Sequence, residues 1–499
     1  MPDWSTLADS LPFSEPPPPD APPKTPERKR RGRPPKEETS TTFEYQGANQ
    51  NVLKLLATVP EPFIEPSGPK PYVIDPADVL IPSPGFVTDF VNLGRGTEAP
   101  TIFLLWGALW TLSAAMNRNA WVQWYPKQLW PNLYVLFVAP AGLCKKSTPI
   151  DFGKSLLELS SNYRPNSVDA FENQYRFVTS KASPAGVYMM LRPEQRMFVQ
   201  DHKIVVAKRS SKITLCISEL ATLLSKQQYM TGLVNDITDL YDCRDHGAEV
   251  TRERGIEPLE YIYITMAGAI TPTGLEESVP QEMLKGGLIS RMVIIYQDLP
   301  TKIYPRPLQI PGYPSLESVA KKLAWIAYNH KGEYHFTEEA EAAFSEWYTE
   351  WKTHIVAGDY ALREDEHRRD TTLRKISMLL RVSEYRPGNE ITLQNFLEAK
   401  AILDYTLNLS SRLLAGVGGT DFSKNLTRVK NYIEKRRTAT RRQILNRFGY
   451  QIPSLELTVL LNQLLDQGII TGTLNDAPIL RASGSPREIY VYQPQGGHK

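Results

Sequence analysis

The stretch LYVLFVAPAGLCKKST, residues 133–148, decides how the chain is expected to fold. Its first six residues form an unbroken apolar run, as in a strand that is buried on both faces of a parallel sheet. The APAG that follows predicts a tight loop, and residues 149–161 have the pattern of a helix. Further apolar runs lie at residues 213–217, 261–270 and 291–296. Because helical stretches separate these runs, we expect a three-layer α/β core around a largely parallel sheet.

The loop after the first of these strands has the residue types of a phosphate-binding loop. Such a loop presents backbone N–H groups at a helix N-terminus, a lysine for the β and γ phosphates and a hydroxyl for magnesium. Lys146 and Ser147 supply the lysine and the hydroxyl. The strict pattern GxxxxGK[ST] is not met, because Pro140 and Lys145 occupy the two glycine positions. The loop therefore fits either a degenerate nucleotide site or a basic turn that caps a helix.

An acidic residue follows the strand expected at residues 213–217. Glu219 comes directly after Ser218 at the end of this run, and a carboxylate in that place can polarise an attacking water molecule. The aspartate that usually precedes such a glutamate is a serine here, which weakens the case for magnesium binding. The alternative is that Glu219 is simply a solvent-exposed acid at the end of a strand, which is a common arrangement.

Two more residues could complete a nucleotide site. Thr271 follows the run at 261–270, and a polar residue at the tip of a neighbouring strand can sense the γ-phosphate. Arg291 follows a glycine-rich turn and could reach the nucleotide of a neighbouring subunit. Such an arginine finger neutralises charge in the transition state.

In this order, the segments APAGLCKKST, LCISEL, YITMAGAITPTGL and GGLISRM resemble the P-loop ATPases of phages, plasmids and other mobile elements. Those proteins pair with primases and are similar to superfamily-3 and AAA+ replicative helicases. The resemblance covers roughly residues 86–414 and rests on the order and spacing of the segments. It implies an AAA+-like three-layer P-loop ATPase core over residues 86–314 and a helical lid over residues 315–420.

The resemblance also implies a role for individual residues. Ser147, or Thr148, would bind Mg²⁺. Glu219 would activate water, Thr271 would sense the γ-phosphate and Arg291 would act in trans. Arg374 or Lys375 would be a second sensor on the lid. Thr273 and Arg369 could serve in place of Thr271 and of the second-sensor pair. The residues expected to bind ATP are Gly142, Lys145, Lys146, Ser147, Thr148, Arg374 and Lys375.

The chain as a whole carries a formal charge of only +2, from 57 Lys and Arg against 55 Asp and Glu. Its two ends are nevertheless strongly basic. Residues 1–50 are expected to form a disordered arm, because eleven of the 40 prolines fall within the first 35 residues. Residues 51–85 would be a linker or extension. Within the arm, Arg31 and Arg33 belong to RKRRGRPPKEE, which resembles an AT-hook for the minor groove of DNA. A non-specific electrostatic tether is the alternative.

Residues 421–499 are expected to form a separate winged-helix-like domain, because three helices precede a hairpin. Nine basic and two acidic residues in the segment 421–449 give a local charge of 9 − 2 = +7, which predicts contact with nucleic acid. The helix at 454–467 contains no Lys or Arg, so contact with phosphates is expected rather than base readout. The candidate DNA-binding residues here are Arg436, Arg437, Arg441 and Arg442.

Residues 244–255 are expected to form a hairpin that lines a pore. Arg252 and Arg254, two positions apart, would share one face and contact DNA phosphates. Glu249 and Glu253 favour the alternative, a surface hairpin with internal ion pairs.

Other classes of protein fit less well. Three scattered cysteines exclude a disulfide framework or a CxxC zinc site, and the longest apolar stretch, residues 102–116, is too short to cross a bilayer. With no secretory segment at Met1, we expect a cytoplasmic protein without a membrane partner, in the bacterial host cytoplasm if it is phage-encoded.

The sequence therefore predicts an ATP-dependent, ring-forming DNA helicase or translocase that replicates a phage or mobile element. It would use ATP and Mg²⁺, act on single-stranded and forked DNA, assemble as a homo-hexamer and work with a possible separate primase. Two alternatives stay open. One is a DNA-remodelling or loading ATPase without unwinding activity, and the other is a DNA-binding initiator or regulator with a degenerate nucleotide site.

Overall fold

The computed structural model describes residues 43–44, 49–61, 75–179, 183–222, 228–251, 255–278, 287–307, 309–357, 366, 368–414, 421–450, 452–475 and 477–493. The chain divides into residues 1–41, which lie outside this part, and residues 42–499. Arg31 and Arg33, the residues of the AT-hook-like segment, are therefore not described.

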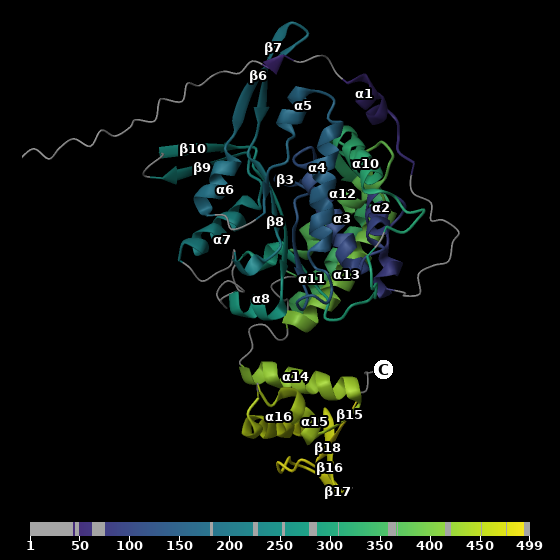
Figure 1. The fold of residues 1–499 in the computed structure, drawn as a ribbon, viewed down its shortest axis with the longest axis vertical. Coiled ribbons are helices and arrows are strands. Elements are labelled where there is room, and N and C mark those ends of the chain that lie inside the picture. Colours follow the sequence, from purple (N-terminus) through teal and green to yellow (C-terminus); the bar gives the residue numbers. More distant parts are fainter. Residues whose placement is uncertain are drawn as a thin grey trace, which may run out of the picture. The chain divides into compact units, whose positions relative to one another are not determined.

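A five-stranded parallel sheet lies at the centre of the fold (Figure 1). Its strand order is β12-β4-β11-β8-β5, and every neighbouring pair is parallel. The predicted α/β fold with a parallel sheet is thereby confirmed. The strands are β4 (Tyr134–Val138), β5 (Phe177–Val178), β8 (Lys212–Ile217), β11 (Tyr263–Ile270) and β12 (Met292–Tyr296).

Helices cover both faces of this sheet. Successive side chains of a strand point to opposite faces, so Val135 and Phe137 pack with α3 and α4, whereas Leu136 and Val138 pack with α6 and α7. Figure 1 shows these two helical layers on either side of β8. The helices are α3 (Thr101–Met116), α4 (Thr148–Ser160), α6 (Pro184–Leu191) and α7 (Gln228–Leu240). Three short helices, α5 (Ser167–Glu172), α8 (Pro272–Ser278) and η4 (Ile289–Arg291), connect the strands, as do the turns η2 (Ser161–Tyr163) and η3 (Leu220–Thr222).

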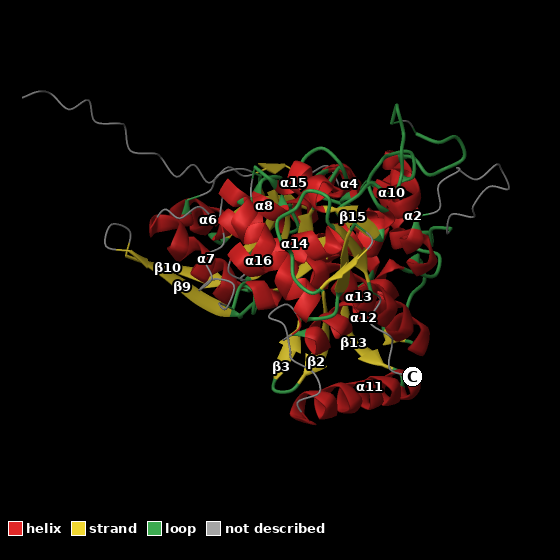
Figure 2. Ribbon diagram, turned by 90° about the horizontal axis from the view of Figure 1, so that it is seen from below, coloured by secondary structure: helices red, strands yellow, loops and turns green. Residues whose placement is uncertain are grey.

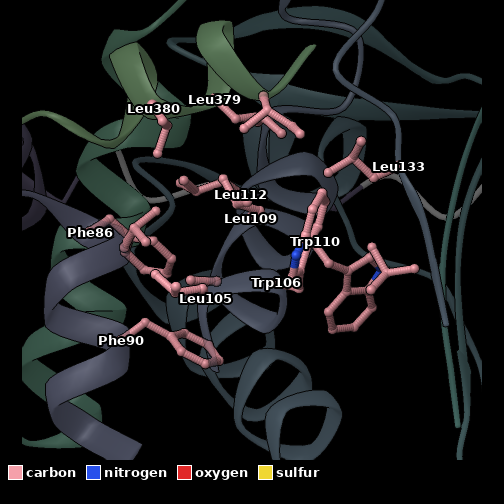
Figure 3. Packing of buried hydrophobic residues seen from close by; sticks show 14 of the residues in the cluster. Phe86, Phe90, Leu105, Trp106, Leu109, Trp110, Leu112, Leu133, Leu379 and Leu380 are labelled. Atoms are coloured by element: carbon pink, nitrogen blue, oxygen red, sulfur yellow. The ribbon is translucent and has the colours of Figure 1, made fainter. Parts of the chain in front are cut away.

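Helix α3 is buried along its whole length, which explains the long apolar stretch in the sequence. Its Trp106 and Trp110 lie beside Leu133 at the start of the sheet (Figure 3). A close approach of α3 to α4 is possible because a glycine stands at each contact. A Cβ atom on Gly107 would lie 2.6 Å from Pro149 of α4, and one on Gly153 of α4 would lie 2.7 Å from the Trp110 ring.

The region expected to be a helical lid shares one hydrophobic cluster with the helices before it. Leu323 of α10, Leu379 of α12 and Ile402 of α13 belong to the same cluster as Phe90 of α2 and Leu109 of α3. The predicted boundary between residues 314 and 315 therefore does not divide the hydrophobic core into two. The helices are α2 (Phe86–Gly94), α10 (Leu316–Asn329), α11 (Glu338–Ala357), α12 (Arg369–Ser383) and α13 (Leu393–Leu414). Helix α1 (Gln50–Ala57) and the turn η1 (Pro76–Leu80) precede them.

A second sheet joins distant parts of the chain within this helical region. Its order is β14-β13-β2-β3, with β13 parallel to β2 from about 200 residues earlier. Figure 2 shows β2, β3 and β13 side by side near α11. The strands are β2 (Ala120–Trp124), β3 (Lys127–Leu129), β13 (Gly332–Phe336) and β14 (Glu390–Ile391).

Two hairpins extend from the central sheet (Figure 1). In the first, β6 (Glu194–Gln200) pairs with β7 (Lys203–Arg209), and β1 (Phe43–Glu44) adds a parallel strand to β6. In the second, β9 (His246–Thr251) pairs antiparallel with β10 (Gly255–Glu260). A hairpin was expected over residues 244–255, and the observed one begins in that range but extends to Glu260.

The C-terminal unit has a hydrophobic cluster of its own, built around Ile444, Leu461 and Tyr490. It consists of three helices and an antiparallel sheet of order β15-β18-β16-β17. The elements are α14 (Asp421–Arg436), β15 (Thr438–Thr440), α15 (Arg441–Phe448), α16 (Ser454–Asp466), β16 (Ile470–Leu474), β17 (Ala477–Ile479) and β18 (Ile489–Tyr492).

In the described part of the chain, no helix combines the length and the apolar character that a membrane crossing requires.

Candidate functional site

The loop of residues 139–147 joins the end of β4 to the start of α4. Gly142 has a φ of +76°, a backbone conformation that glycine adopts without steric cost. Lys145 also lies in the left-handed region, with a φ of +46°, although its side chain makes this conformation unfavourable. Helix α4 begins at Thr148, with Ser147 as its N-cap residue. The loop therefore leads directly into a helix N-terminus, where backbone N–H groups favour an anion.

The polar side chains of this loop are available to a ligand. Lys145 is exposed, and its Nζ lies 3.4 Å from a carboxylate oxygen of Glu98. Lys146 and Ser147 are half-buried, and the Ser147 side chain makes no capping bond to the helix. The Ser147 hydroxyl is thus a suitable ligand for a hard cation such as Mg²⁺.

Cys144 anchors the same loop to the protein. Its side chain is fully buried, and the Sγ atom lies 3.7 Å from the carbonyl oxygen of Gln297, directly after β12. Burial raises the pKa of the Cys144 thiol to about 11. The thiol is therefore neutral at physiological pH and holds the loop in place rather than acting as a nucleophile.

Three strands of the sheet end close to this loop, β4 and β11 at the same level and β8 two residues earlier. Ile270 of β11 pairs with Val138 of β4, and Gly268 pairs with Ile217 of β8. Thr271 and Glu219, which follow these strands, therefore lie at the same carboxyl edge of the sheet as the loop. Because β11 separates β4 from β8, the acid-bearing strand is about 10 Å from the loop-bearing strand. Ligands of open α/β sheets bind at this edge.

Glu219 and Thr271 lie in different surroundings. Glu219 is exposed and stands between the end of β8 and Leu220, whose side chain is fully buried. The Thr271 hydroxyl accepts a 3.0 Å hydrogen bond from the backbone N–H of Gly274, so it caps α8. It also lies 3.3 Å from the hydroxyl of Thr273.

Arg291 lies at the opposite edge of the sheet. It immediately precedes β12, so it is at the amino edge, about 16 Å from the loop by the length of a five-residue strand. Its guanidinium donates a 2.8 Å hydrogen bond to the carbonyl of Gly287 and lies 3.8 Å from Asp242. The structure therefore does not bring Arg291 to the loop of its own chain.

Lys375 is also at the amino edge. Its Nζ donates hydrogen bonds of 2.8 Å to both the carbonyl and the side-chain oxygen of Asn132, just before β4, and one of 3.0 Å to the Tyr241 hydroxyl. Only 2% of this lysine is exposed. Lys375 therefore lies at the end of β4 opposite to the loop, so it cannot act as a second sensor for the nucleotide of its own chain.

Arg374 is engaged within the helical region. It forms a two-fold hydrogen bond to Glu341, at 3.0 and 2.6 Å, and its guanidinium lies 3.8 Å from the centre of the Phe344 ring. The alternative residue, Arg369, pairs with Asp404 and lies over Trp347. Neither arginine is at the 139–147 loop, because α12 begins at the amino edge of the sheet.

The residues expected to bind DNA fall into three groups. Arg252 and Arg254, which come between β9 and β10 in the sequence, lie outside the described residues, as does the N-terminal arm. Arg436, Arg437 and Arg442 are exposed on the C-terminal unit. Arg441 forms the third group, and its predicted role in DNA binding is wrong.

Arg441 is buried, with 1% of its side chain exposed. It donates hydrogen bonds to the Ser454 carbonyl at 3.0 Å and to the Thr458 hydroxyl at 2.6 Å, and lies 3.8 Å from Glu488. It is therefore an interior residue that joins α15 to α16, and it is not available to DNA. Its place three residues before the buried Ile444, on the same helical face, was the signal for this in the sequence.

Sequence reasoning also missed Asp242 and Arg368, which lie close to Arg291. The Arg368 guanidinium is 3.6 Å from Asp242, and both Arg368 and Arg291 lie over the Tyr241 ring. Nothing in the local sequence marks this group, since more than 120 residues separate Asp242 from Arg368.

No protein-family model matches the chain, and a search of curated proteins also finds no match.

Proposed function

We propose that this protein is an ATP-hydrolysing, ring-forming DNA translocase or helicase with an AAA+-like P-loop core, acting in the replication of a phage or mobile element. The observation that carries the proposal is the meeting of four features at the carboxyl edge of the sheet: Lys146, Ser147, Glu219 and Thr271. These residues follow three separate strands, β4, β8 and β11, whose adjacency in the sheet brings them to the same edge.

Each residue has a distinct part in hydrolysis. Lys146 at the N-terminus of α4 would bind the β and γ phosphates, and Glu219 would orient and polarise the attacking water. The Ser147 hydroxyl, which makes no capping bond, would hold Mg²⁺. The bound ion would neutralise charge on the phosphates. The Thr271 hydroxyl accepts a bond from Gly274 and keeps its own proton to donate to the γ-phosphate.

The position of Arg291 supports a ring. It lies at the amino edge of the sheet, so it would act only on the nucleotide of another subunit. Head-to-tail packing sets the amino edge of one subunit against the carboxyl edge of the next, and such packing closes into a ring when the rotation allows. By resemblance to the mobile-element ATPases, we propose a homo-hexamer.

Contact with DNA would come from the hairpin and from both ends of the chain. Arg252 and Arg254 come between β9 and β10 in the sequence and would contact phosphates there. In the C-terminal unit, the succession of helix, strand, two helices and a hairpin supports a winged-helix-like domain. Its exposed Arg436, Arg437 and Arg442 would contact phosphates.

Hydrolysis of ATP by the purified full chain, with and without single-stranded DNA, tests the proposal. Lys146→Ala should abolish hydrolysis and the separation of forked DNA. Lys331→Ala is the matched control, because Lys331 is an exposed lysine outside the loop, directly before β13, and its loss should leave hydrolysis unchanged. Full activity in Lys146→Ala would refute the mechanism.

The same experiment separates the alternatives. Hydrolysis stimulated by DNA without strand separation would select a loading or remodelling ATPase. Binding of duplex DNA without any binding of ATP would select an initiator with a degenerate nucleotide site.

A further inference from the structure

A cavity of about 350 Å³ lies between the hairpin β2–β3 and the start of α12. Asn132, just before β4, and Tyr241, just after α7, also line it, and both are buried. On the hairpin side, the lining residues Tyr125 and Lys127 are exposed, so the cavity is open to solvent there. Its volume is within the range of sites for small ligands or for single groups of larger ones.

One aromatic ring of this cavity is available for stacking. In three of the four aromatic residues that line it, a cation already lies over the ring. These pairs are Trp124 with Arg374, Trp130 with Arg118 and Tyr241 with Lys375, at 4.8, 4.1 and 4.1 Å from the ring centre. The fourth ring, that of Tyr125, is 92% exposed, and within the described part of the chain no cation or second ring lies against it.

The position of Tyr125 is fixed by the hairpin. Trp124 pairs with Lys127 across β2 and β3, so Tyr125 and Pro126 form the turn between them. The Tyr125 ring and the Lys127 ammonium group therefore stand close together at the open side of the cavity. An aromatic ring next to a cation is the pairing that proteins use to bind single-stranded nucleic acid, where the ring stacks on a base and the cation meets a phosphate.

The residues that line the cavity carry a net positive charge. Lys127, Arg368 and Lys375 are opposed by one carboxylate, that of Asp242, which gives 3 − 1 = +2. The Lys375 Nζ donates to three neutral acceptors, so these contacts leave its charge uncompensated. The Arg368 guanidinium is 33% exposed and lies 3.6 Å from Asp242, which is longer than a charge-assisted hydrogen bond. Arg368 can therefore make shorter contacts to a phosphate.

We infer that this cavity binds one nucleotide unit of single-stranded DNA, with its base stacked on Tyr125 and its flanking phosphates on Lys127 and Arg368. Lys127 belongs to β3 and Arg368 directly precedes α12, so the two cations come from different walls of the cavity. Because the hairpin side is open, a strand can continue beyond the bound unit in both directions. The choice of DNA rests on the proposed function, and the cavity adds a contact separate from the hairpin β9–β10 and the two ends of the chain.

Binding of a labelled oligothymidylate to the full chain, measured by fluorescence anisotropy without ATP, is the first test. Tyr125→Ala should weaken binding about 5- to 150-fold, as expected for the loss of one stacked base. Tyr125→Phe keeps the ring, so it is the matched control and should bind like the wild type. The exposure of Tyr125 means that neither change should disturb the fold.

A strand of the same length with abasic sites separates stacking from charge. Its binding should not respond to Tyr125→Ala, because it has no base to stack. Lys127→Ala should weaken the binding of both strands and lower the salt dependence of log K by about 0.7, as for the loss of one phosphate contact to a single strand. Lys331→Ala, which removes an exposed cation elsewhere, is the control and should change neither.

Photocrosslinking locates the contact directly. A strand that carries 5-iododeoxyuridine should crosslink to Tyr125, within the tryptic peptide of residues 119–127. The crosslink should disappear when an excess of unlabelled oligothymidylate is added.

Three results would overturn the inference. The first is equal binding of oligothymidylate by the wild type and Tyr125→Ala, with crosslinks only elsewhere, which would leave the proposed function intact. The second is binding of thymidine monophosphate that Tyr125→Ala abolishes while binding of oligothymidylate is unchanged, because the cavity would then receive a free small molecule. The third is a wild-type chain that binds no oligothymidylate. A crosslink at Tyr125 in a chain that does not hydrolyse ATP would instead support the cavity site and refute the proposed function.

Discussion

The backbone amide of Ala139 donates a 3.3 Å hydrogen bond to the carbonyl oxygen of Ile270. This bond extends the pairing of β4 and β11 by one step beyond β4, to the first residue of the 139–147 loop. Backbone hydrogen bonds alone therefore hold Thr271 next to that loop, without a side-chain contact.

Replacing Thr271 by valine should remove both roles of its hydroxyl. Loss of the bond to Gly274 should weaken the N-terminus of α8, at a cost of about 1 kcal/mol in the free energy of unfolding. Loss of the donor should reduce kcat for ATP hydrolysis. Thr271→Ser keeps the hydroxyl and is the control, so equal rates in the two variants would exclude a role as sensor.

Glu219→Gln should separate ATP binding from hydrolysis. The glutamine has the same length but cannot accept a proton from water, so kcat should fall about a hundredfold or more. The affinity for ATP should change little, since Glu219 lies about 10 Å from the loop-bearing strand. Rapid-quench measurement of phosphate release and equilibrium binding of ATP report the two effects. An unchanged kcat would assign water activation to another residue.

Arg441 and Arg442 are adjacent in sequence and should behave differently. Arg441→Ala removes the cation beside the buried Glu488 together with the hydrogen bonds to Ser454 and Thr458, so the C-terminal unit should lose about 3–5 kcal/mol of stability. Hydrogen exchange across residues 421–493 of the full chain measures this loss. Equal protection in wild type and variant would contradict the interior role of Arg441.

Arg442→Ala should leave that protection unchanged, because the side chain is exposed. If it contacts a phosphate, its loss should weaken DNA binding uniformly across sequences and lower the salt dependence of log K by about one. A titration of labelled DNA at several salt concentrations shows whether it does.

His330 should make the stability of the fold depend on pH. Burial lowers its pKa from 6.5 to about 4, and the charge of Arg381 acts in the same direction. The unfolded chain therefore binds a proton between these two values when the folded chain does not, so stability is complete above pH 6.5 and falls as the pH drops toward 4. The loss is about 3 kcal/mol over that range.

His330→Gln provides the comparison, since glutamine can still hydrogen-bond Tyr334 but does not titrate in this range. The difference in unfolding free energy between wild type and variant should change with pH between 6.5 and 4. A constant difference would show that the imidazole has the same pKa in the folded and the unfolded chain.

The core strands could be predicted because each is buried on both faces and therefore apolar throughout. The run at residues 213–217 is β8, and those at 261–270 and 291–296 are β11 and β12 within one or two residues. The order of these strands could not be predicted, because an apolar run does not reveal its neighbours. Strand β13 was missed for a related reason: its partner β2 lies about 200 residues away, and the surrounding composition is helical.

The candidate site was predicted in part. Residues at strand ends, such as Glu219 and Thr271, could be assigned to one edge because parallel strands share their carboxyl edge. Arg374 and Lys375 could not, because a helical pattern indicates which face is buried and not which end of the sheet the helix reaches. The partnership of Arg368 with Asp242 depends entirely on the tertiary fold.

The separation of the loop and the arginines to opposite edges of one sheet makes each chain a directional building block. In the proposed mechanism, a single chain would carry two unmatched halves of a catalytic centre, and a head-to-tail pair would complete one centre while leaving two halves unused. Only a closed assembly matches every half, so the hydrolysis rate per chain should increase with protein concentration and level off when closure is complete.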